Sequence, residues 1–516
     1  MRTRVLGAPA VLVLVAAAAS AQVYNPTPEW QSADMQVSTG AALADLNNDG
    51  WLDLIVANGN DISLQRTVVY YNNGAGVLQT SPGWQSADLA YNGHLDVADV
   101  DGDGWLDVAV AVLLPQGGKS AKLYRNVGGT LTTSPVWQSS ITPDTFGVAF
   151  GDMNLDGRPD LALASGDAYS NVPAINVVYL NVGGTLAASP SWSTATTRNF
   201  NNCAWVDADD DGDLDLIQCG SAMRTYCYRN LGTTLETTAT AWSTSDSTNQ
   251  FCLMAVAGDV TGDGRKDVII ADNNQIFGGT GRFRRYDGQA GGFFSSAANW
   301  TYNEGYTAAV TLGDLNNDGK LDLLTGEWFG RARYFLNTGS GLPATPSWTS
   351  GGVTTTVEKL VLGDTRNRAR KVYTASFGAT ARRLYQLPRQ PIETIVSVVR
   401  DGVPLTRAQF TYNREHAWVS VHAAPASSLK ISYIYSRSLD LAVSNWDDNR
   451  PNQVYHNRLA PPCPADFNDD GAVDDFDVFD FLNVFNEGDP AADFNLDGSV
   501  DDFDYFDFLN RFFSNC

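Results

Sequence analysis

One pattern of apolar and polar positions recurs along most of the chain. A run of small apolar residues, such as residues 148–151, leads into a stretch rich in Asp and Asn around a Gly. An alternating apolar run follows, as in residues 161–164, and then an aromatic segment that ends in Asn and Gly, as in residues 123–129. Each unit closes on a segment with a Trp, at positions 84, 137, 192, 242, 300 and 348. Alternation with period two between turn residues predicts about four short strands per unit.

The Asp-rich stretch, which we call the acidic box, returns at intervals of 50 to 55 residues. The boxes start at Asp45, Asp99, Asp152, Asp207, Asp259 and Asp314, with a degenerate seventh at Asp364. Four-stranded units with a period of this length are typical of blades set around a central channel. The sequence therefore predicts a mainly β fold, a seven-bladed β-propeller of four-stranded blades, with eight blades as the alternative.

Segments near both ends of the repeat array are predicted to close the ring. Residues 27–32 contain a Trp but precede the first box, so they have no blade of their own. We expect them to complete the last blade with residues 439–445 and 452–457, which would remove an open sheet edge. The propeller is predicted to span residues 22–459. Within it, residues 388–436 depart from the period and are either an insertion in the seventh blade or part of an eighth.

The first residues have the features of an export signal. Arg2 and Arg4 precede an apolar run over residues 5–19 and small residues at 19–21. Residues 1–21 are therefore predicted to be a signal peptide cleaved near Ala21, leaving a secreted protein that is extracellular or envelope-associated. No later stretch reaches the roughly 18 apolar residues of a transmembrane helix, and we expect no transmembrane segment.

The overall composition narrows the classes of partner. Hydrophobic residues make up 43% of the chain and aromatic residues 11%, which is too much for a disordered protein. The 34 basic and 58 acidic residues give a net charge of −24. This balance argues against nucleic acid and anionic membranes, because both are bound by clustered Lys and Arg. Divalent cations are the natural counter-charge.

The acidic boxes supply the ligands that such cations need. The box that starts at Asp99 can direct five oxygen ligands at one metal ion: the side chains of positions 1, 3, 5 and 9 and the carbonyl of position 7. Gly104 permits the sharp turn that brings them together. Hard oxygen ligands in this number favour calcium over a transition metal. The competing interpretation is an Asp-Gly turn without metal. Such a turn needs only one or two of these residues, whereas four positions agree in all six boxes, which favours the metal. The seventh box carries Arg366 and Arg368 at ligand positions, so we expect it to bind no ion.

Six boxes are thus predicted calcium sites in the propeller. Their candidate ligands are Asp45, Asn47, Asp49, Trp51 and Asp53; Asp99, Asp101, Asp103, Trp105 and Asp107; Asp152, Asn154, Asp156, Arg158 and Asp160; Asp207, Asp209, Asp211, Asp213 and Asp215; Asp259, Thr261, Asp263, Arg265 and Asp267; and Asp314, Asn316, Asp318, Lys320 and Asp322. The repeated unit resembles the FG-GAP or VCBS repeat, the blade of the integrin alpha-subunit propeller and of many bacterial secreted proteins. This resemblance implies adhesion or ligand binding, although some eight-bladed relatives are polysaccharide lyases.

Residues 460–516 are predicted to form a second, small all-α module. Two loops 27 residues apart have an acidic residue at position 12 and run into helix-like apolar segments, as in half of an EF-hand. The candidate ligands are Asp466, Asn468, Asp470, Ala472, Asp474 and Asp477 in the first loop, and Asp493, Asn495, Asp497, Ser499, Asp501 and Asp504 in the second. With the propeller boxes, the loops would bring the total to about eight calcium ions.

This tail resembles a bacterial dockerin whose loops lie between two cysteines, here Cys463 and Cys516. The resemblance implies that the tail docks on a cohesin-like or other envelope protein; the alternative is a calcium-stabilised cap that binds nothing. The two short helices carry more Phe than such a module can bury, so the surplus should face a partner. We expect Cys463 and Cys516, which bracket the paired loops, to form a disulfide clasp.

The other four cysteines are clustered in the middle of the chain. An even number of cysteines suits an oxidising compartment, and no CxxC spacing supports a metal-thiolate site. The expected disulfides are Cys219–Cys227 and Cys203–Cys252.

Catalytic motifs are missing from the sequence. The histidines lie outside any nucleophile, zinc or phosphate-binding motif; they are His94, His416, His422 and His456. Arg282, Arg284 and Arg285 either supply cations for a uronate or form a solvated strand face. The sequence therefore predicts a binding or adhesion module whose ligand, a glycan or a protein, lies on a propeller face. The alternative is a carbohydrate-active enzyme of the lyase type. Arg, Tyr and His gathered in one pocket would favour the enzyme.

Overall fold

The structure is a computed structural model that describes residues 22–116, 118–167, 172–339, 341–447 and 449–514. The predicted signal peptide and Cys516 lie outside these residues, so the cleavage site and the Cys463–Cys516 clasp stay predictions. No helix in the described ranges is long and apolar enough to cross a membrane.

The innermost strands form a closed ring. Each contacts the next in chain order, and β27 contacts β2. Most of their side chains are buried, because neighbouring sheets pack on both faces. The inner strands are β2 (Ser38–Ala44), β6 (Asn92–Ala98), β10 (Thr145–Gly151), β15 (Phe200–Val206), β19 (Gln250–Gly258), β23 (Tyr306–Gly313) and β27 (Val357–Gly363).

Each inner strand pairs with an antiparallel second strand that begins at an Asp. The second strands are β3 (Asp53–Asn58), β7 (Asp107–Val112), β11 (Asp160–Asp167), β16 (Asp215–Met223), β20 (Asp267–Asp272), β24 (Asp322–Trp328) and β35 (Asp440–Asn445). The third strands are β4 (Thr67–Tyr70), β8 (Ala121–Tyr124), β13 (Val177–Tyr179), β17 (Tyr226–Tyr228), β21 (Arg282–Tyr286), β25 (Arg333–Phe335) and β36 (Gln453–Tyr455). Two irregular pieces are β12 (Val172–Pro173), which pairs with β11, and the 3₁₀ turn η1 (Gln275–Phe277). β16 also pairs with β19, which joins two of the four-stranded groups.

The outer strands begin with the repeated Trp. They are β5 (Trp84–Gln85), β9 (Trp137–Gln138), β14 (Trp192–Ser193), β18 (Trp242–Ser243), β22 (Trp300–Asn303), β26 (Trp348–Thr349) and, for the last sheet, β1 (Trp30–Gln31). The indole N–H of Trp84 donates to the carbonyl of Leu131 in the next sheet at 2.9 Å. β1 pairs with β36, with Trp30 opposite Val454, so the predicted closure by the N-terminal segment is confirmed.

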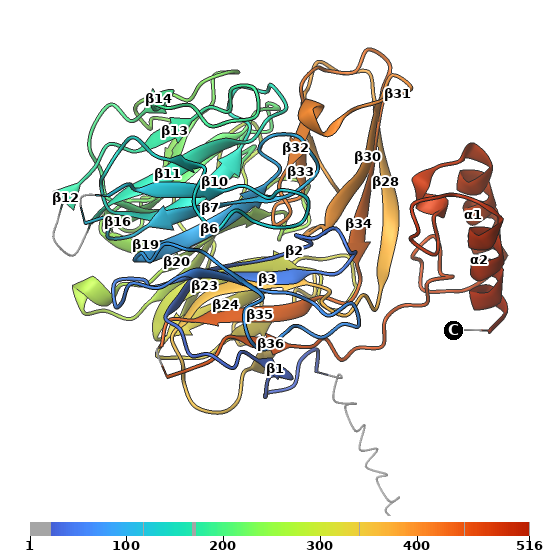
Figure 1. Ribbon diagram of the computed structural model, residues 1–516, viewed down its shortest axis with the longest axis horizontal. Helices are drawn as coiled ribbons and strands as arrows, with labels where there is room; N and C mark the ends of the chain where they lie inside the picture. Colours follow the sequence, from blue (N-terminus) through green and yellow to red (C-terminus); the bar gives the residue numbers. More distant parts are fainter. Residues whose placement is uncertain (1–21, 117, 168–171, 340, 448, 515–516) are drawn as a thin grey trace, which may run out of the picture.

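The irregular stretch forms two extra sheets between β27 and β35, outside the ring (Figure 1). It begins with β28, earlier than the predicted residue 388, because β28 pairs with β34 and β29 pairs with β33 in these two sheets. We call residues 370–436 the insertion. Its elements are β28 (Arg370–Gly378), β29 (Leu384–Gln386), β30 (Thr394–Arg400), β31 (Val403–Pro404), η2 (Arg407–Gln409), β32 (Phe410–Tyr412), β33 (Trp418–Val421) and β34 (Ser428–Ser436).

The insertion lies against the acidic boxes. The Ser420 hydroxyl donates to Asp152 Oδ2 at 2.7 Å, and Arg383 Nη1 donates to the carbonyl of Leu155 at 2.7 Å. Both acceptors belong to the third box. The insertion therefore covers the end of the ring at which inner strands turn into second strands.

The tail contains α1 (Asp475–Glu487), η3 (Pro490–Ala492) and α2 (Asp502–Ser514). Its core is small, with Phe481 stacked on Phe508 at a centroid distance of 4.2 Å. Asp474 caps α1 and accepts from the main-chain N–H of Phe476, and Gly488 ends the helix with a positive φ of 64°.

The tail contacts the insertion through Asp469. Three cationic side chains, two from the insertion and one from the residue that follows it, converge on this carboxylate. Asp469 lies 3.2 Å from Lys371 Nζ, 2.6 Å from Arg389 Nη2 and 2.7 Å from Arg437 Nη1. In addition, η3 contacts β28. These contacts orient the loops of the tail toward the insertion, and Figure 1 shows the two helices on the side away from the ring.

The disulfides predicted for the central cysteines are wrong, since Cys203, Cys219, Cys227 and Cys252 are free thiols. Cys227 lies opposite Ile217 in β16, two residues from Cys219, so their side chains are not cross-strand neighbours. Cys203 points to the face of its sheet that packs on the preceding sheet. Cys252 packs with Cys219 and Cys227 in a different core cluster, so Cys203 and Cys252 do not meet.

Candidate calcium sites and the central channel

The predicted propeller ligands lie in the turns between inner and second strands, and the ligand at position 9 is the first residue of the second strand. At position 6 of the six boxes and the two tail loops, Gly has a φ between 79° and 98°, a region that Gly adopts readily. In the first box, Asp45 accepts hydrogen bonds from the main-chain N–H groups of Asp49 (3.1 Å) and Gly50 (2.8 Å). The turn thus wraps around the carboxylate at position 1.

Two boxes bring together several carboxylates. Ligand oxygens of Asp99, Asp101 and Asp103 lie within 4.8 Å of one another, and the same holds for Asp207, Asp209 and Asp215. Several of the oxygens are buried and accept no hydrogen bond, which is costly for a carboxylate. The buried oxygens without a donor are Asp101 Oδ1, Asp207 Oδ1, Asp209 Oδ1 and Asp213 Oδ1 in the propeller and Asp466 Oδ1 in the tail.

Burial, helped by neighbouring carboxylates, raises the pKa of the acids at position 9. The pKa of Asp53, Asp107 and Asp322 rises to about 7, and that of Asp215 to about 9. A divalent cation in their midst would favour the charged form. The clustered carboxylates, the unused oxygens and the hard donor set therefore fit calcium. Positions 1, 3, 5 and 9 with the carbonyl of position 7 would hold the ion, which supplies the missing positive charge.

Position 9 is also tied into the fold. In the second box, Asp107 Oδ1 accepts from the N–H of Asn126 at 2.7 Å, and Oδ2 accepts from the N–H of Val100 at 3.1 Å. The amide of Asn126 in turn donates to the carbonyl of Leu46, in the box of the preceding sheet, at 2.7 Å. Equivalent amides link neighbouring boxes around the ring: Asn72, Asn181, Asn230, Asn337 and Asn457. The sequence shows these Asn residues at the ends of the aromatic strands, but their role depends on contacts between sheets.

In three boxes, the side chain at position 7 folds back on the Asp at position 5. The pairs are Arg158 with Asp156 at 2.5 Å, Lys320 with Asp318 at 3.2 Å, and Arg265 with Asp263. Each pair neutralises one carboxylate of its box. The boxes at Asp99 and Asp207 carry such a pair at position 3 instead, where Arg125 lies 2.7 Å from Asp101 and Arg229 lies 3.0 Å from Asp209.

The insertion splits the seventh box. Asp364 occupies position 1, and Asp440, which starts β35, takes the part of position 9 by accepting from the N–H of Asn457 at 2.8 Å. Arg366 Nη2 lies 2.8 Å from Asp440 Oδ1, and its Nε lies 3.2 Å from Oδ2. A guanidinium group therefore supplies the positive charge in this box.

Arg366→Met is expected to destabilise the protein by about 3 kcal/mol, the lower end of the cost of leaving a buried charge without its partner. Asp440 is fully buried and would face Asp364 without a cation. Urea unfolding in calcium measures the effect. Arg368→Met is the control, because Arg368 Nη1 reaches only the carbonyl of Asn457. Equal stability of the two variants would contradict the assigned role.

The tail loops have the same turn, and their position 12 carboxylates cap helices. Asp477 accepts from the N–H of Phe467 at 2.7 Å and from that of Asp474 at 2.9 Å. Asp504 makes the equivalent pair of contacts in the second loop. Positions 1, 3 and 5 of each loop lie in the turn. This donor set, with the unused oxygen of Asp466, again fits a hard cation.

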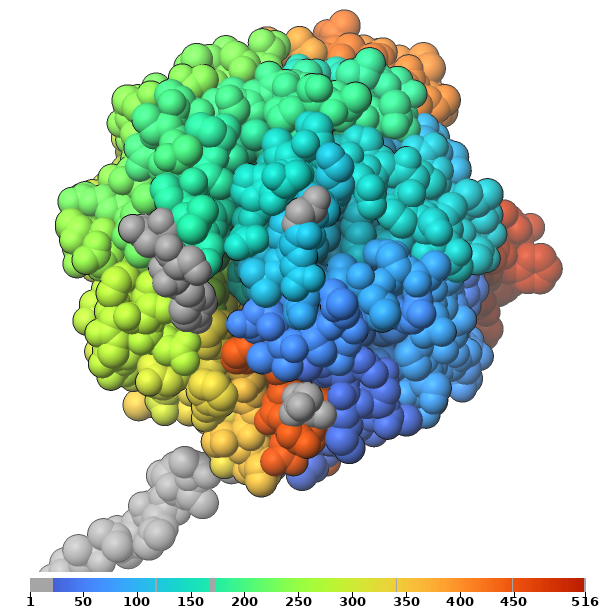
Figure 2. Space-filling model, turned by 60° about the vertical axis from the view of Figure 1, so that its left-hand side comes forward, coloured from blue at the N-terminus to red at the C-terminus, as the bar shows by residue number. Residues whose placement is uncertain are grey.

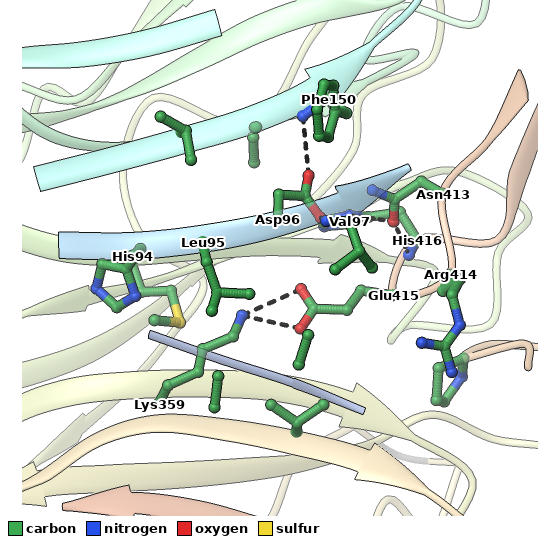
Figure 3. A pocket seen from close by; sticks show the side chains of 18 of the residues that line it. His94, Leu95, Asp96, Val97, Phe150, Lys359, Asn413, Arg414, Glu415 and His416 are labelled. Carbon is green, nitrogen blue, oxygen red and sulfur yellow. Dashed lines mark hydrogen bonds and ion pairs between the residues drawn. The ribbon is translucent and has the colours of Figure 1, made fainter. Parts of the chain in front are cut away.

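The central channel contains a small polar cavity of about 80 Å³ between the inner strands and residues 413–416 of the insertion (Figure 3). Lys359 Nζ lies 2.8 Å from Glu415 Oε1, and Asp96 accepts from the N–H of Phe150 at 2.8 Å. Burial lowers the pKa of His94 to about 3 and that of His416 to about 4. Both histidines are therefore neutral at pH 7.

This cavity gathers part of the set of Arg, Tyr and His side chains that would favour an enzyme. His94, His416 and Arg414 line it, but no Tyr does among the described lining residues. Its volume suits a few water molecules, not a sugar. The arginines considered for uronate binding are paired elsewhere: Arg284 lies 3.5 Å from Asp272, and Arg285 lies 2.6 Å from Asp287. Arg284 and Arg285 are also buried, so they do not form a solvated strand face.

Comparison with known proteins identifies the repeats. Residues 45–110, 99–163, 155–218 and 259–325 match the family described as FG-GAP-like repeat. No curated protein matches the chain. Among solved structures, BBS1N in complex with ARL6DN, soaked with mercury, has a TM-score of 0.45 at 11% identity and covers 85% of this chain and 98% of that chain. Saccharomyces cerevisiae Sqt1 has a TM-score of 0.43 at 10% identity and covers 82% and 97%. The chain carries FG-GAP-like repeats, and its closed order of four-stranded sheets is that of a β-propeller.

Proposed function

We propose that this protein is a secreted, calcium-binding propeller of seven blades that acts as a binding or adhesion module and is held to a partner by a dockerin-like tail. Seven inner strands in contact around the ring support the blade number. The insertion adds no strand to that order. Two of the six boxes have clustered carboxylates and unused carboxylate oxygens, which supports calcium as the cofactor.

The observation that carries the anchoring role is the set of exposed Phe side chains on the tail. Phe476 is 68% exposed and Phe479 is 62% exposed in α1, and the equivalent Phe503 and Phe506 of α2 are 71% and 58% exposed. Phe513 is 77% exposed. Soluble proteins rarely leave this many large apolar side chains in water unless they serve an interaction. A cohesin-like or other envelope protein would cover them.

Replacing these side chains should release the protein from its partner. We expect the full-length variant with Phe476→Ser, Phe479→Ser, Phe503→Ser and Phe506→Ser to be retained on the envelope fraction of the source organism at least tenfold less than the parent, in calcium. Val403→Ser is the control, because Val403 is 63% exposed but lies on the insertion. Retention that is unchanged in the Phe variant, with its calcium content intact, would leave the tail as a cap without a partner.

A further inference from the structure

The end of the channel opposite the acidic boxes holds a pocket of about 260 Å³. Its residues come from the starts of inner strands, such as Phe146 and Phe251, and from the ends of second strands or just beyond them, such as Trp328 and Trp446. The acidic boxes lie at the opposite end of the ring, between the ends of the inner strands and the starts of the second strands. Because the insertion covers the box end, the pocket faces the opposite side of the ring, which comes forward in Figure 2.

Aromatic side chains form much of the wall. The rings of Trp328 and Trp446 lie 5.2 Å apart between centroids at an angle of 32°, and Phe251 packs edge-on against Trp328. Trp328 and Phe251 are buried, whereas Trp446 is partly exposed. The pocket thus offers aromatic surface that solvent can reach.

Three carboxylates lie among the lining residues: Asp61, Asp144 and Asp167. Among the described lining residues there is no Lys, Arg or His. Burial raises the pKa of Asp144, and the nearby charge of Asp167 raises it further. Asp144 and Asp167 are therefore close enough to repel one another, and a ligand with negative charge would add to that repulsion.

An organic cation fits both the aromatic wall and the carboxylates of the pocket. Trp faces attract an ammonium group within about 6 Å of the ring centre, and carboxylates pair with the same charge. The volume lies below the roughly 300–1,000 Å³ of sites for drug-sized ligands, so the pocket suits one small group and not an oligosaccharide.

We propose that this pocket binds an alkylammonium group, with its alkyl part against Trp328 and Trp446 and its charge beside Asp61 and Asp144. The proposal rests on the proposed binding function and specifies the chemistry of its ligand. The group belongs either to a small free amine or to a Lys side chain of a partner protein.

Calorimetric titration of the full-length, calcium-loaded protein tests this assignment. Choline and N-acetyl-lysine amide represent the two sources, and 3,3-dimethyl-1-butanol is the uncharged counterpart of choline. We expect at least one of the two cations to bind at least tenfold more tightly than the alcohol. Binding of choline alone indicates a free amine, and binding of the lysine amide alone indicates a side chain. If neither cation binds, or if the alcohol binds as well as they do, the proposal is wrong.

Variants locate the site. Trp446→Leu and Asp144→Asn should each weaken binding of the cation at least fivefold, whereas Asp480→Asn, an exposed change on α1, should leave it unchanged. Equal binding by all three would overturn the assignment to this pocket, provided that their melting temperatures match the parent. Envelope retention of the same samples separates the two proposals. Retained protein that binds no cation overturns only the pocket, and cation binding without retention overturns only the anchor.

Discussion

EDTA is expected to lower the melting temperature of the purified protein by more than about 10 °C. Each site stabilises the folded state by about 2.7 kcal/mol when free calcium is 100-fold above its Kd, and about eight sites act together. Without calcium, the buried acids of the boxes must be protonated or repel one another, in a chain with a net charge of −24. Scanning calorimetry in calcium and in EDTA measures the shift.

Matched variants show whether the boxes are responsible. Asp101→Asn with Asp103→Asn should remove one bound calcium ion, counted by atomic emission on the desalted protein. Asp364→Asn should leave the count unchanged, because Arg366 supplies the charge in the seventh box. A content of two ions or fewer in the parent, with the same melting temperature in EDTA, would contradict the six-box interpretation.

Trp30→Ala is expected to lower the free energy of unfolding by about 3–5 kcal/mol, the usual cost of truncating a buried Trp. Trp30 is 7% exposed, packs against Tyr70 and donates its indole N–H to the carbonyl of Leu78. It also lies in β1, which closes the ring, so the variant weakens the junction between the first and last sheets. Urea unfolding in calcium gives the value.

The neighbouring residue is the control for this change. Gln31 lies in the same two-residue strand but is exposed, and Gln31→Ala should cost less than about 0.5 kcal/mol. If Trp30→Ala cost no more than this, closure by the N-terminal segment would contribute nothing to stability.

The ring and its boxes could be predicted because both depend on local, repeated signals. Alternation of apolar residues fixes which side of a strand is buried, and Gly104 at position 6 has the positive φ that the turn requires. Trp30 without a blade of its own was enough to predict β1. Such features need no knowledge of contacts between distant residues.

The remaining features depend on how sheets pack. Asp440 follows the insertion in the chain, so its place in the seventh box beside Arg366 is visible only in the fold. Asn126 reaches a carbonyl of the preceding sheet, which no local pattern reveals. The predicted Cys219–Cys227 pair was wrong because strand register decides which side chains meet: Cys227 lies opposite Ile217. The aromatic pocket gathers single residues from many sheets, so it has no sequence motif.

Anomalous diffraction from crystals grown in calcium tests the calcium assignment most directly. Data collected at a long wavelength reveal each bound ion as a peak. The account predicts a peak in each of the six propeller boxes and in both tail loops, and none between Asp364 and Asp440. Boxes without peaks, or a peak beside Arg366, would contradict it.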